Sequence, residues 1–274
     1  MKILMCTGGS KFAERAVDLS ANLLDEEDDI TLFYVKEKGV NGDTVSKCRD
    51  ILEKHALAAK IKVKDNRYGV ASEILKESQE NYDLIVMGSL GVTSISHGSF
   101  HRFILGMNAF RVVENAKKSV LIARGTSSLK RILVSVSGSR HDYEIAEFAC
   151  SLVRSHAEKV KFLRVIPEFS KHFKVFIPPN VRDSMRELLE DEVFERPEKE
   201  CLDRCVKIAE KYNIPTIKTK LREGDAAAQI LHEAEEGGYD LIVIGARKSH
   251  KFPLGDTAHR IVNYSRCSFL VVRK

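Results

Sequence analysis

A glycine-rich segment in the first half of the chain has the composition of a phosphate-binding loop. Gly88 and Gly91 follow a short apolar run, and Gly106 opens a segment that continues with Met107 and Asn108. Glycines allow the backbone to approach a phosphate closely, and a helix N-terminus offers free N–H groups and a positive dipole. The alternative from spacing alone is that Gly88 and Gly91 only turn the chain and that Gly106 starts a helix.

The second half carries a related but unequal loop. Gly245 follows the corresponding apolar run, Lys248 stands where a second glycine is expected, and Gly255 is followed by Asp256 and Thr257. A carboxylate beside a phosphate repels it, so Asp256 disfavours an anion unless Lys248 compensates. The alternative is that Asp256 complements the dipole at a helix N-terminus. The first half, which has no acid in its loop, is therefore the better candidate for nucleotide binding.

Two histidines in the first loop have metal-binding spacing. His97 and His101 are four residues apart, as in a two-histidine clamp, and Arg102 follows directly. No third ligand is evident nearby, and the three side chains offer a phosphate contact instead. The acidic run 25–29 lacks the glycine and the spacing of a calcium loop, so we expect it in a solvated turn. No metal site is predicted.

The six cysteines form no Cys-x-x-Cys pair and no regular framework. Such usage is typical of a reducing, cytoplasmic location. Cys201 and Cys205 are four residues apart, which is a spacing that could bind a metal together with a nearby histidine. The favoured interpretation is that both are small buried side chains.

Ser139, His141 and Asp142 include the residue types of a hydrolase triad, but adjacency in sequence does not give triad geometry. A serine with an acid three residues later is typical of the cap that opens a helix. Ser10 occupies the matching place in the first half and is expected to cap a helix as well.

Composition limits the class of protein. The 274 residues include 44 Lys and Arg against 39 Asp and Glu, with 43% hydrophobic residues and a net charge of +5. Such a chain buries a full core, and its charge is too small to indicate nucleic acid or an anionic membrane as a partner. No apolar run approaches the length of a membrane span, and Met1-Lys2-Ile3-Leu4 opens as a strand rather than as a signal peptide.

An internal repeat divides the chain into two copies of one domain. The segment Tyr82–Gly88 returns as Tyr239–Gly245, and each half ends in a serine followed by an apolar strand. A repeat this long indicates a duplicated domain rather than a solenoid, whose periods are about 20–50 residues. We predict domains at residues 1–124 and 130–274, joined by a polar linker at residues 125–129.

Strands and helices alternate in each half. Continuous apolar runs have the length and β-branching of strands buried on both faces. In the first half these runs are Ile3–Cys6, Thr31–Val35, Leu84–Met87 and Val120–Ala123. Helical periodicity separates them at Ala13–Leu24, Val45–Ala59, Ala71–Glu80 and Asn108–Ala116. The second half repeats this order, so the predicted fold is α/β, with two tandem doubly wound, largely parallel sheets.

A longer insert distinguishes the second half. The stretch from Phe169 to Pro179 interleaves aromatic residues with lysine and histidine. We expect it to pack against its own domain rather than to cover a ligand or meet a partner. Pro197 interrupts the helical pattern that follows, so Val181–Glu195 and Glu198–Tyr212 are expected to be separate or kinked helices.

The order of elements resembles the universal stress protein family. The resemblance rests on the Asp-Leu-Ile-Val-Met-Gly strand, the glycine loop, the Leu-Gly pair before a helix and the final Ser-Val-Leu-Ile-Ala strand. It covers both halves, so the chain is similar to tandem universal stress proteins. It implies Rossmann-like domains of the adenine-nucleotide α-hydrolase type. It also implies that Val120–Ala123 and Phe269–Val272 pair and join the halves as an internal pseudo-dimer.

ATP-binding members of that family carry a G-x2-G-x9-G-[ST] loop, from which both halves depart. In the first half, Gly106 follows Gly91 after fourteen residues, and Met107 replaces the hydroxyl residue. In the second half, Lys248 replaces the second glycine and Asp256 takes the place of the hydroxyl residue.

The family also has a Val-Asp-Gly-Ser segment after its first strand, with the aspartate near the adenosine. Gly8 and Ser137 stand where that aspartate is expected. Neither half therefore has the complete pattern. The candidate nucleotide-binding residues are Gly8, Val35, Met87, Gly88, Gly91, Gly106, Met107, Asn108, Gly245, Lys248, Gly255, Asp256 and Thr257.

The resemblance implies a non-enzymatic stress-response or regulatory module that retains a degraded site for ATP or AMP. The alternative is a protein-interaction scaffold that works without nucleotide. An ATP-hydrolysing enzyme is a lesser alternative, because no base or magnesium-binding acid is evident near the glycine loop. The implied partners are an adenine nucleotide and an unidentified protein, with a homodimer as a further option.

Overall fold

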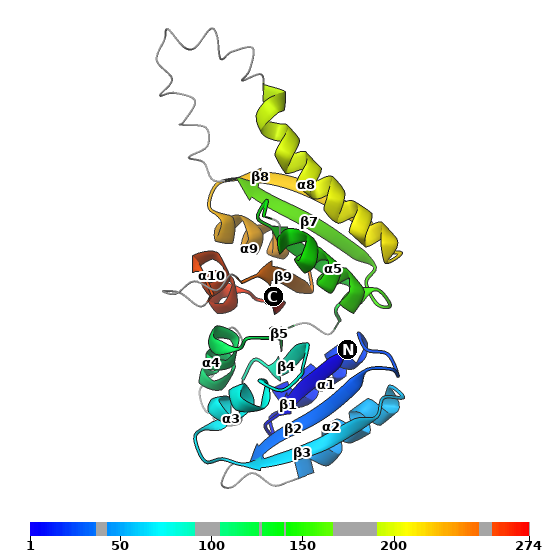
Figure 1. The fold of residues 1–274 in the computed structure, drawn as a ribbon, viewed down its shortest axis with the longest axis vertical. Coiled ribbons are helices and arrows are strands. Elements are labelled where there is room, and N and C mark those ends of the chain that lie inside the picture. Colours follow the sequence, from blue (N-terminus) through cyan, green and yellow to red (C-terminus); the bar gives the residue numbers. More distant parts are fainter. Residues whose placement is uncertain are drawn as a thin grey trace.

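The computed structural model describes residues 1–36, 43–90, 105–125, 128–139, 141–166, 191–246 and 254–273, and for Asp43 and residues 191–198 the backbone alone. Ten strands form one sheet in the order β3-β2-β1-β4-β5-β10-β9-β6-β7-β8 (Figure 1). The strands are β1 Lys2–Thr7, β2 Asp29–Lys36, β3 Ala59–Asp65, β4 Leu84–Gly88, β5 Ser119–Ala123, β6 Arg131–Val136, β7 Lys159–Ile166, β8 Ile217–Glu223, β9 Leu241–Gly245 and β10 Ser268–Val272. The helices in these ranges are α1 Lys11–Ala21, α2 Asp43–Lys54, α3 Val70–Glu77, α4 Met107–Asn115, α5 His141–Val153, α8 Asp191–Lys211, α9 Ala226–Glu236 and α10 Asp256–Tyr264.

The sheet is parallel within each half and antiparallel where the halves meet. β1 pairs with β2 and β4, and β6 pairs with β7 and β9, all in parallel. β5 and β10 pair antiparallel, with Leu121 opposite Leu270. The predicted α/β fold is therefore confirmed, and so is the pairing of the two final strands. Each half reverses its strand order once, between β1 and β4 and between β9 and β6.

The four strands expected in the first half all form, but β3 was missed. Six of its seven residues are exposed, because lysines alternate with apolar residues along an edge strand. No continuous apolar run therefore marks it. The prediction of a helix over Val45–Ala59 was too long, since α2 ends at Lys54 and Ala59 already belongs to β3.

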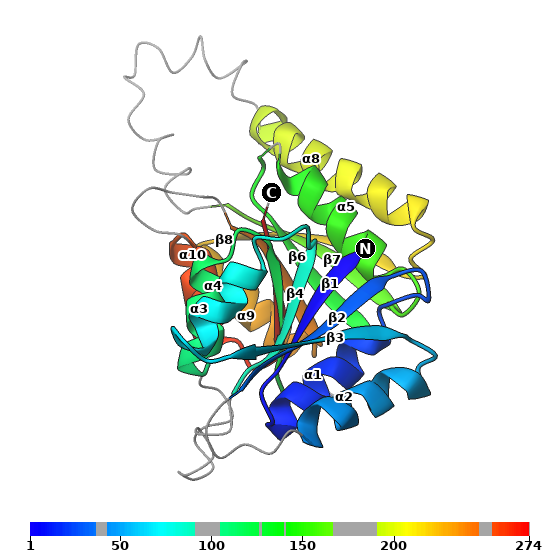
Figure 2. The same ribbon diagram turned by 60° about the horizontal axis from the view of Figure 1, so that its bottom comes forward.

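Helices cover both faces of the sheet, as Figure 2 shows. α1, α2, α5 and α8 pack their apolar residues into one core with one face of the strands. α3, α4, α9 and α10 form a second core on the opposite face. Neighbouring residues of a strand point to opposite faces, so Ile3 enters the first core and Leu4 the second. Strands buried on both faces are continuous apolar runs for this reason.

Two local predictions about helix starts are confirmed. Ser10 is the N-cap of α1, and its Oγ accepts a hydrogen bond from the Ala13 N–H at 3.2 Å. At the start of α5, the Asp142 carboxylate accepts the Ser139 N–H at 2.6 Å. These short-range patterns were readable because both partners lie within one turn of helix.

Other expectations have mixed outcomes. All six cysteines are free and buried, which confirms the structural interpretation of Cys201 and Cys205. Residues 25–28 of the acidic run form the expected turn, while Asp29 begins β2. The option of separate helices around Pro197 is wrong, because α8 runs through that residue. In the described part of the chain, no helix is long and apolar enough to cross a membrane.

Candidate functional site

A cavity of about 750 Å³ lies at the strand-order reversal of the second half. Residues that follow β6 and β9 line it, including Ser137, Ser139 and Ala246. Ligands of open α/β sheets bind at this position, beyond the carboxyl ends of the strands. Volumes of roughly 300–1,000 Å³ are usual for small-molecule sites. The cavity is therefore placed and sized as a ligand site.

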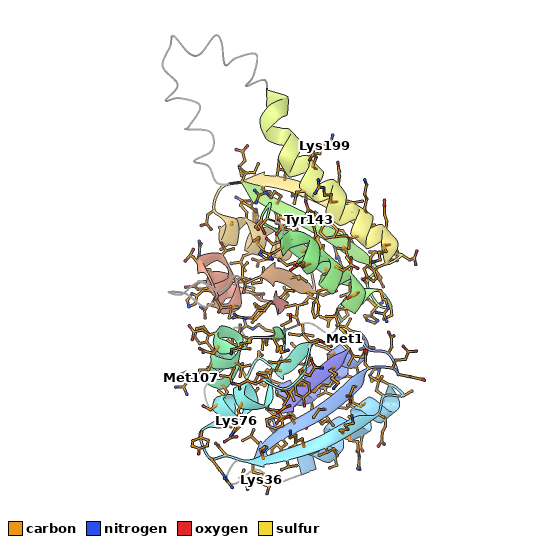
Figure 3. The ribbon with its side chains drawn as sticks, in the orientation of Figure 1. Met1, Lys36, Lys76, Met107, Tyr143 and Lys199 are labelled. Atoms are coloured by element: carbon orange, nitrogen blue, oxygen red, sulfur yellow. The ribbon has the colours of Figure 1, made fainter. Side chains whose placement is uncertain are left out.

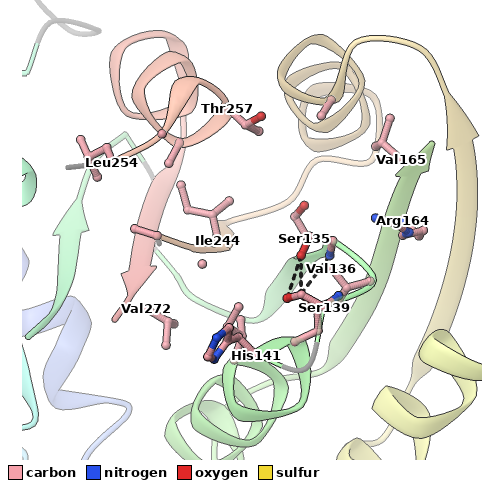
Figure 4. A pocket seen from close by; sticks show the side chains of 18 of the residues that line it. Ser135, Val136, Ser139, His141, Arg164, Val165, Ile244, Leu254, Thr257 and Val272 are labelled. Carbon is pink, nitrogen blue, oxygen red and sulfur yellow. Dashed lines mark hydrogen bonds between the residues drawn. The ribbon is translucent and has the colours of Figure 1, made fainter. Parts of the chain in front are cut away.

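Three helices begin at the wall of this cavity. His141 opens α5, Ala226 opens α9, and Asp256 with Thr257 opens α10, and all four line the cavity. The first N–H groups of a helix have no partner within the helix and carry partial positive charge. Figure 4 shows Thr257 of α10 and Arg164 of β7 on different sides of the cavity. Polar donors thus surround a space that also has an apolar floor.

The apolar lining comes from the strand ends and from α10. It includes Val136, Val165, Ile244, Leu254, Ala258 and Val272, and Ile145 of α5 adds to it. All seven are buried. This division into apolar and polar walls suits a ligand with a flat apolar ring and a polar substituent.

The loop between β6 and α5 is held by a buried carboxylate. Asp142 is 1% exposed, and its Oδ1 accepts the Ser137 N–H at 2.9 Å and the Ser137 hydroxyl at 3.0 Å. Its Oδ2 accepts the Ser139 N–H at 2.6 Å and lies 3.9 Å from the Cys201 thiol. The carboxylate is therefore engaged in shaping the cavity wall and is not presented as a free acid.

An ion pair fastens the rim formed by α9 and α10. Asp225 is the N-cap of α9 and accepts the Ala228 N–H at 2.7 Å. Its other oxygen accepts Nη1 of Arg260 from α10 at 2.6 Å. The hydrogen bond from Arg260 holds the pKa of Asp225 below its ordinary value. The two helices that open on the cavity are thus linked beside it.

The corresponding reversal in the first half is arranged differently. The Ser10 hydroxyl donates to the Leu90 carbonyl at 2.9 Å, which joins the loop after β1 to the loop after β4. Leu90 is 6% exposed. In the second half the matching Ser139 hydroxyl accepts a hydrogen bond from the Ser137 hydroxyl at 3.0 Å, and residues 247–253 of the loop after β9 lie outside the described part of the chain. Among the described residues, the first-half reversal is therefore crossed by a hydrogen bond, and the second-half reversal borders the cavity.

The predicted residues of the first half are spread around this crossed reversal. Val35 and Met87 are buried strand residues, 3% and 7% exposed, and a Cβ at Gly8 would meet open space. Gly88 lies against the backbone of Phe12, so its role there is close packing.

In the first half, the described chain resumes at Leu105, shortly before α4. Gly106 is the N-cap of α4, and its N–H donates to the Ser89 carbonyl at 2.8 Å. Met107 is 67% exposed and lies on the outer surface in Figure 3, and Asn108 is half-buried. A helix start is thus present here, but Met107 brings no hydrogen-bond donor to it.

In the second half, the predicted residues converge. Gly245, Gly255, Asp256 and Thr257 all line the cavity. Gly255 has φ +75°, which favours glycine, and it is the N-cap of α10. Asp256 is 84% exposed and 3.9 Å from Arg260, as expected for an acid at a helix start.

Other residues of the cavity were missed by sequence reasoning. Arg164 and Ala226 line it, together with Ser137 and Glu144. Arg164 is the third residue from the end of β7. Its place near the carboxyl end of a parallel strand could have indicated that it borders the ligand site. Ala226 offered no signal, because alanine carries no chemistry and its position depends on how α9 packs.

Several predicted residues lie outside the described part of the chain. These are Gly91, His97, His101, Arg102, Lys248 and the stretch 169–179. Predictions about them stay predictions. Among the residues that the structure describes, no three His, Cys, Asp or Glu side chains are grouped so as to hold a metal ion.

Known proteins share both the sequence pattern and the architecture. The Universal stress protein family matches residues 1–124 and 128–273. Universal stress protein MJ0531 of Methanocaldococcus jannaschii is 27% identical over 157 residues, which are 56% of this chain and 88% of that protein. A universal stress protein of Methanothermobacter thermautotrophicus is 27% identical over 148 residues, 53% of this chain and 95% of that protein.

A solved structure extends the likeness over the whole chain. The crystal structure of a universal stress protein from Archaeoglobus fulgidus has a TM-score of 0.66, with 99% of this chain and 98% of that chain covered. At 19% identity, this likeness shows the shared fold alone. The two family matches extend over nearly all residues. The chain therefore belongs to the universal stress protein family and carries two of its domains in tandem.

Proposed function

We propose that this chain binds an adenine nucleotide in the second-half cavity and acts as a non-enzymatic stress-response or regulatory module. The two domains of the proposal are residues 1–124 and 130–274, joined by residues 125–129. The setting is a reducing cytoplasm, in which the buried cysteines stay as thiols. Nucleotide binding would regulate the module by favouring one conformation over another, which requires different affinities for the two.

One observation carries the proposal: a cavity of about 750 Å³ at the strand-order reversal, onto which α5, α9 and α10 open. The apolar residues Ile244 and Val165 suit the flat face of a base, and the helix starts with Thr257 suit a phosphate. The repulsion expected from Asp256 is reduced by its exposure to water and by Arg260, 3.9 Å away. The choice of adenine follows from membership of the family. The preference for the first half stays a prediction, because most of its glycine loop lies outside the described residues.

The non-enzymatic part of the proposal is supported by the state of the acids around the cavity. Asp142 is engaged by the N–H groups of Ser137 and Ser139. Glu144 and Asp256 are 49% and 84% exposed at the rim, where water competes for any proton or metal ion they would handle. Release of phosphate from ATP above background by the purified chain would contradict this part.

Adenine nucleotides are expected to stabilise the full chain against heat. Ligand at 100 times its Kd adds about 2.7 kcal/mol, which corresponds to a rise in Tm of roughly 5–10 °C for a chain of this size. The measurement is a thermal-shift series with ATP, ADP, AMP and cAMP, followed by calorimetric titration with an expected stoichiometry of one. cAMP is included because one solved universal stress protein is described in complex with it.

Tryptophan substitutions on α9 provide a matched pair for locating the site. Ala226 lines the cavity and Ala228 is exposed two residues further along. Ala226→Trp is expected to remove the shift, and Ala228→Trp to retain it. A shift that survives Ala226→Trp but disappears with Met107→Glu would place binding in the first half instead. No shift with any nucleotide would leave the nucleotide-independent scaffold as the function.

A further inference from the structure

Two arginines hold the halves together in a reciprocal arrangement. Arg124 follows β5 and Arg273 follows β10, the two strands that pair antiparallel between the halves. The end of each strand therefore lies beside the start of the other. The Arg124 N–H donates to Ser268 Oγ at 3.0 Å, and the Arg273 N–H donates to Ser119 Oγ at 3.2 Å.

Each guanidinium then reaches the C-terminus of a helix in the opposite half. Nη1 of Arg124 donates to the Ser265 carbonyl at 2.7 Å and the Val262 carbonyl at 3.3 Å, at the end of α10. Nη2 of Arg273 donates to the Val113 and Glu114 carbonyls at 2.8 and 3.0 Å, at the end of α4. The last carbonyls of a helix lack partners within the helix and carry partial negative charge. A cation from the other half thus caps each helix.

Arg124 is buried to a degree that is unusual for an arginine. It is 2% exposed and lies over the ring of Phe269, 5.3 Å from its centroid. Its Nε and Nη2 have no hydrogen-bond partner within the described residues. Burial lowers the pKa of Arg124 to about 10, which leaves it charged at neutral pH. Removing this charge from water costs free energy, and the contacts of Arg124 with α10 offset part of that cost.

The helix that Arg124 caps, α10, is also one of the three helices that begin at the cavity. α10 has nine residues, from Asp256 to Tyr264, and the cavity is lined by its first three. The far end of this short helix is held by Arg124 of the first half. Phe110 of α4 also meets His259 of α10 across the seam, with ring centroids 5.8 Å apart.

We propose that Arg124, a residue of the first half, is a positioning residue for the cavity of the second half. The second half by itself would then keep the ion pair of Arg260 with Asp225 near the start of α10 but lack the contact that holds its far end. Arg273 has the mirror role for α4, with its guanidinium on the first half, although Val272 directly before it lines the second-half cavity. The consequence for ligand binding rests on the proposed function, whereas the consequence for α10 does not.

The test is amide hydrogen exchange on the full chain, with two matched variants. Arg124→Met keeps the length of the side chain and removes its charge and donors, and Arg273→Met does the same in the mirror position. Arg124→Met is expected to speed exchange in α10 at least tenfold while α4 stays within twofold of wild type. Arg273→Met should give the opposite pattern. Arg124→Lys, which keeps a charged donor, should fall between wild type and Arg124→Met.

A uniform increase in exchange over both halves, or no increase in α10, would overturn the proposal. If Arg124→Met does not fold, the same comparison is made between Arg124→Lys and Arg273→Lys. Affinity for AMP is measured in parallel, and Arg124→Met is expected to weaken it at least tenfold and clearly more than Arg273→Met does. Unchanged affinity in Arg124→Met would sink the positioning role. Absence of binding in wild type would sink the proposed function, while exchange in α10 would still decide the role of Arg124.

Discussion

Glu233→Gln is expected to destabilise the chain by about 3 kcal/mol at neutral pH. Glu233 lies on α9 and is 3% exposed, and its carboxylate accepts hydrogen bonds from three cations. Lys161 donates at 2.5 Å, Lys220 at 2.7 Å and Arg222 at 2.7 Å. A neutral amide in this place leaves Lys161 and Lys220 without their counter-charge, while Arg222 keeps its ion pair with Glu236 at 3.1 Å. Urea unfolding of both proteins measures the loss.

The same carboxylate predicts a pH dependence. Burial raises the pKa of Glu233, but the hydrogen bonds from Lys161, Lys220 and Arg222 outweigh burial and lower it to about 2. The folded-state value is thus below the unfolded value of 4.5. The stability from Glu233 is therefore complete above about pH 5 and is lost as the pH falls toward 2. The difference between wild type and Glu233→Gln should shrink over that range.

The first half offers a control for this cluster. Glu77 is 6% exposed on α3 but has one lysine partner, Lys62 at 2.6 Å, together with the Tyr82 hydroxyl at 3.1 Å. Glu77→Gln leaves one lysine without its carboxylate, whereas Glu233→Gln leaves two lysines without theirs and removes one of the two carboxylate partners of Arg222, so Glu77→Gln should cost clearly less. Equal losses in the two variants would contradict the assignment of stability to the three-cation cluster.

Gly88→Ala is expected to cost about 3 kcal/mol, and Gly245→Ala, its counterpart in the second half, about 1 kcal/mol. A Cβ at Gly88 would lie 2.6 Å from the backbone carbonyl of Phe12, in the first turn of α1. Backbone cannot move without shifting the helix against the sheet. A Cβ at Gly245 would overlap the tip of the Ile145 side chain, which can change rotamer. Thermal and urea unfolding of both variants compare the costs.

The smaller loss in Gly245→Ala should come with weaker nucleotide binding. Ile145 lines the cavity, so a rotamer change that relieves the overlap moves the side chain within the wall of the site. Adding Ile145→Val removes the overlapping Cδ1 and should restore both stability and affinity. If Gly245→Ala proved as destabilising as Gly88→Ala, the distinction between backbone and side-chain neighbours would be wrong.

Much of the fold could be predicted from the sequence because its signals are local or repeated. Central strands such as β1 and β4 are buried on both faces, so the residues between their ends must nearly all be apolar. The helix caps at Ser10 and Asp142 involve partners within five residues. Edge strands carry no such signal. β3 forms through its pairing with β2, although its own residues are exposed.

The candidate site depended on contacts between distant segments. Glycine spacing led to a preference for the first half, since the second loop has an acid at Asp256. That spacing says nothing about Ser10, whose hydroxyl reaches Leu90 eighty residues away. It also says nothing about Arg164, which reaches the cavity from β7.

By itself, the sequence determined the duplication, the α/β class, the family and the glycines and caps around the two strand-order reversals. The tertiary structure decided that the second-half reversal borders a cavity, that Arg124 is buried and that each half caps a helix of the other. The physical reason is how far apart in the sequence the contacting residues lie. A cap or an apolar run is settled within a few residues, whereas Arg124 meets the carbonyl of Ser265, 141 residues away, only after both halves have folded and β5 has paired with β10.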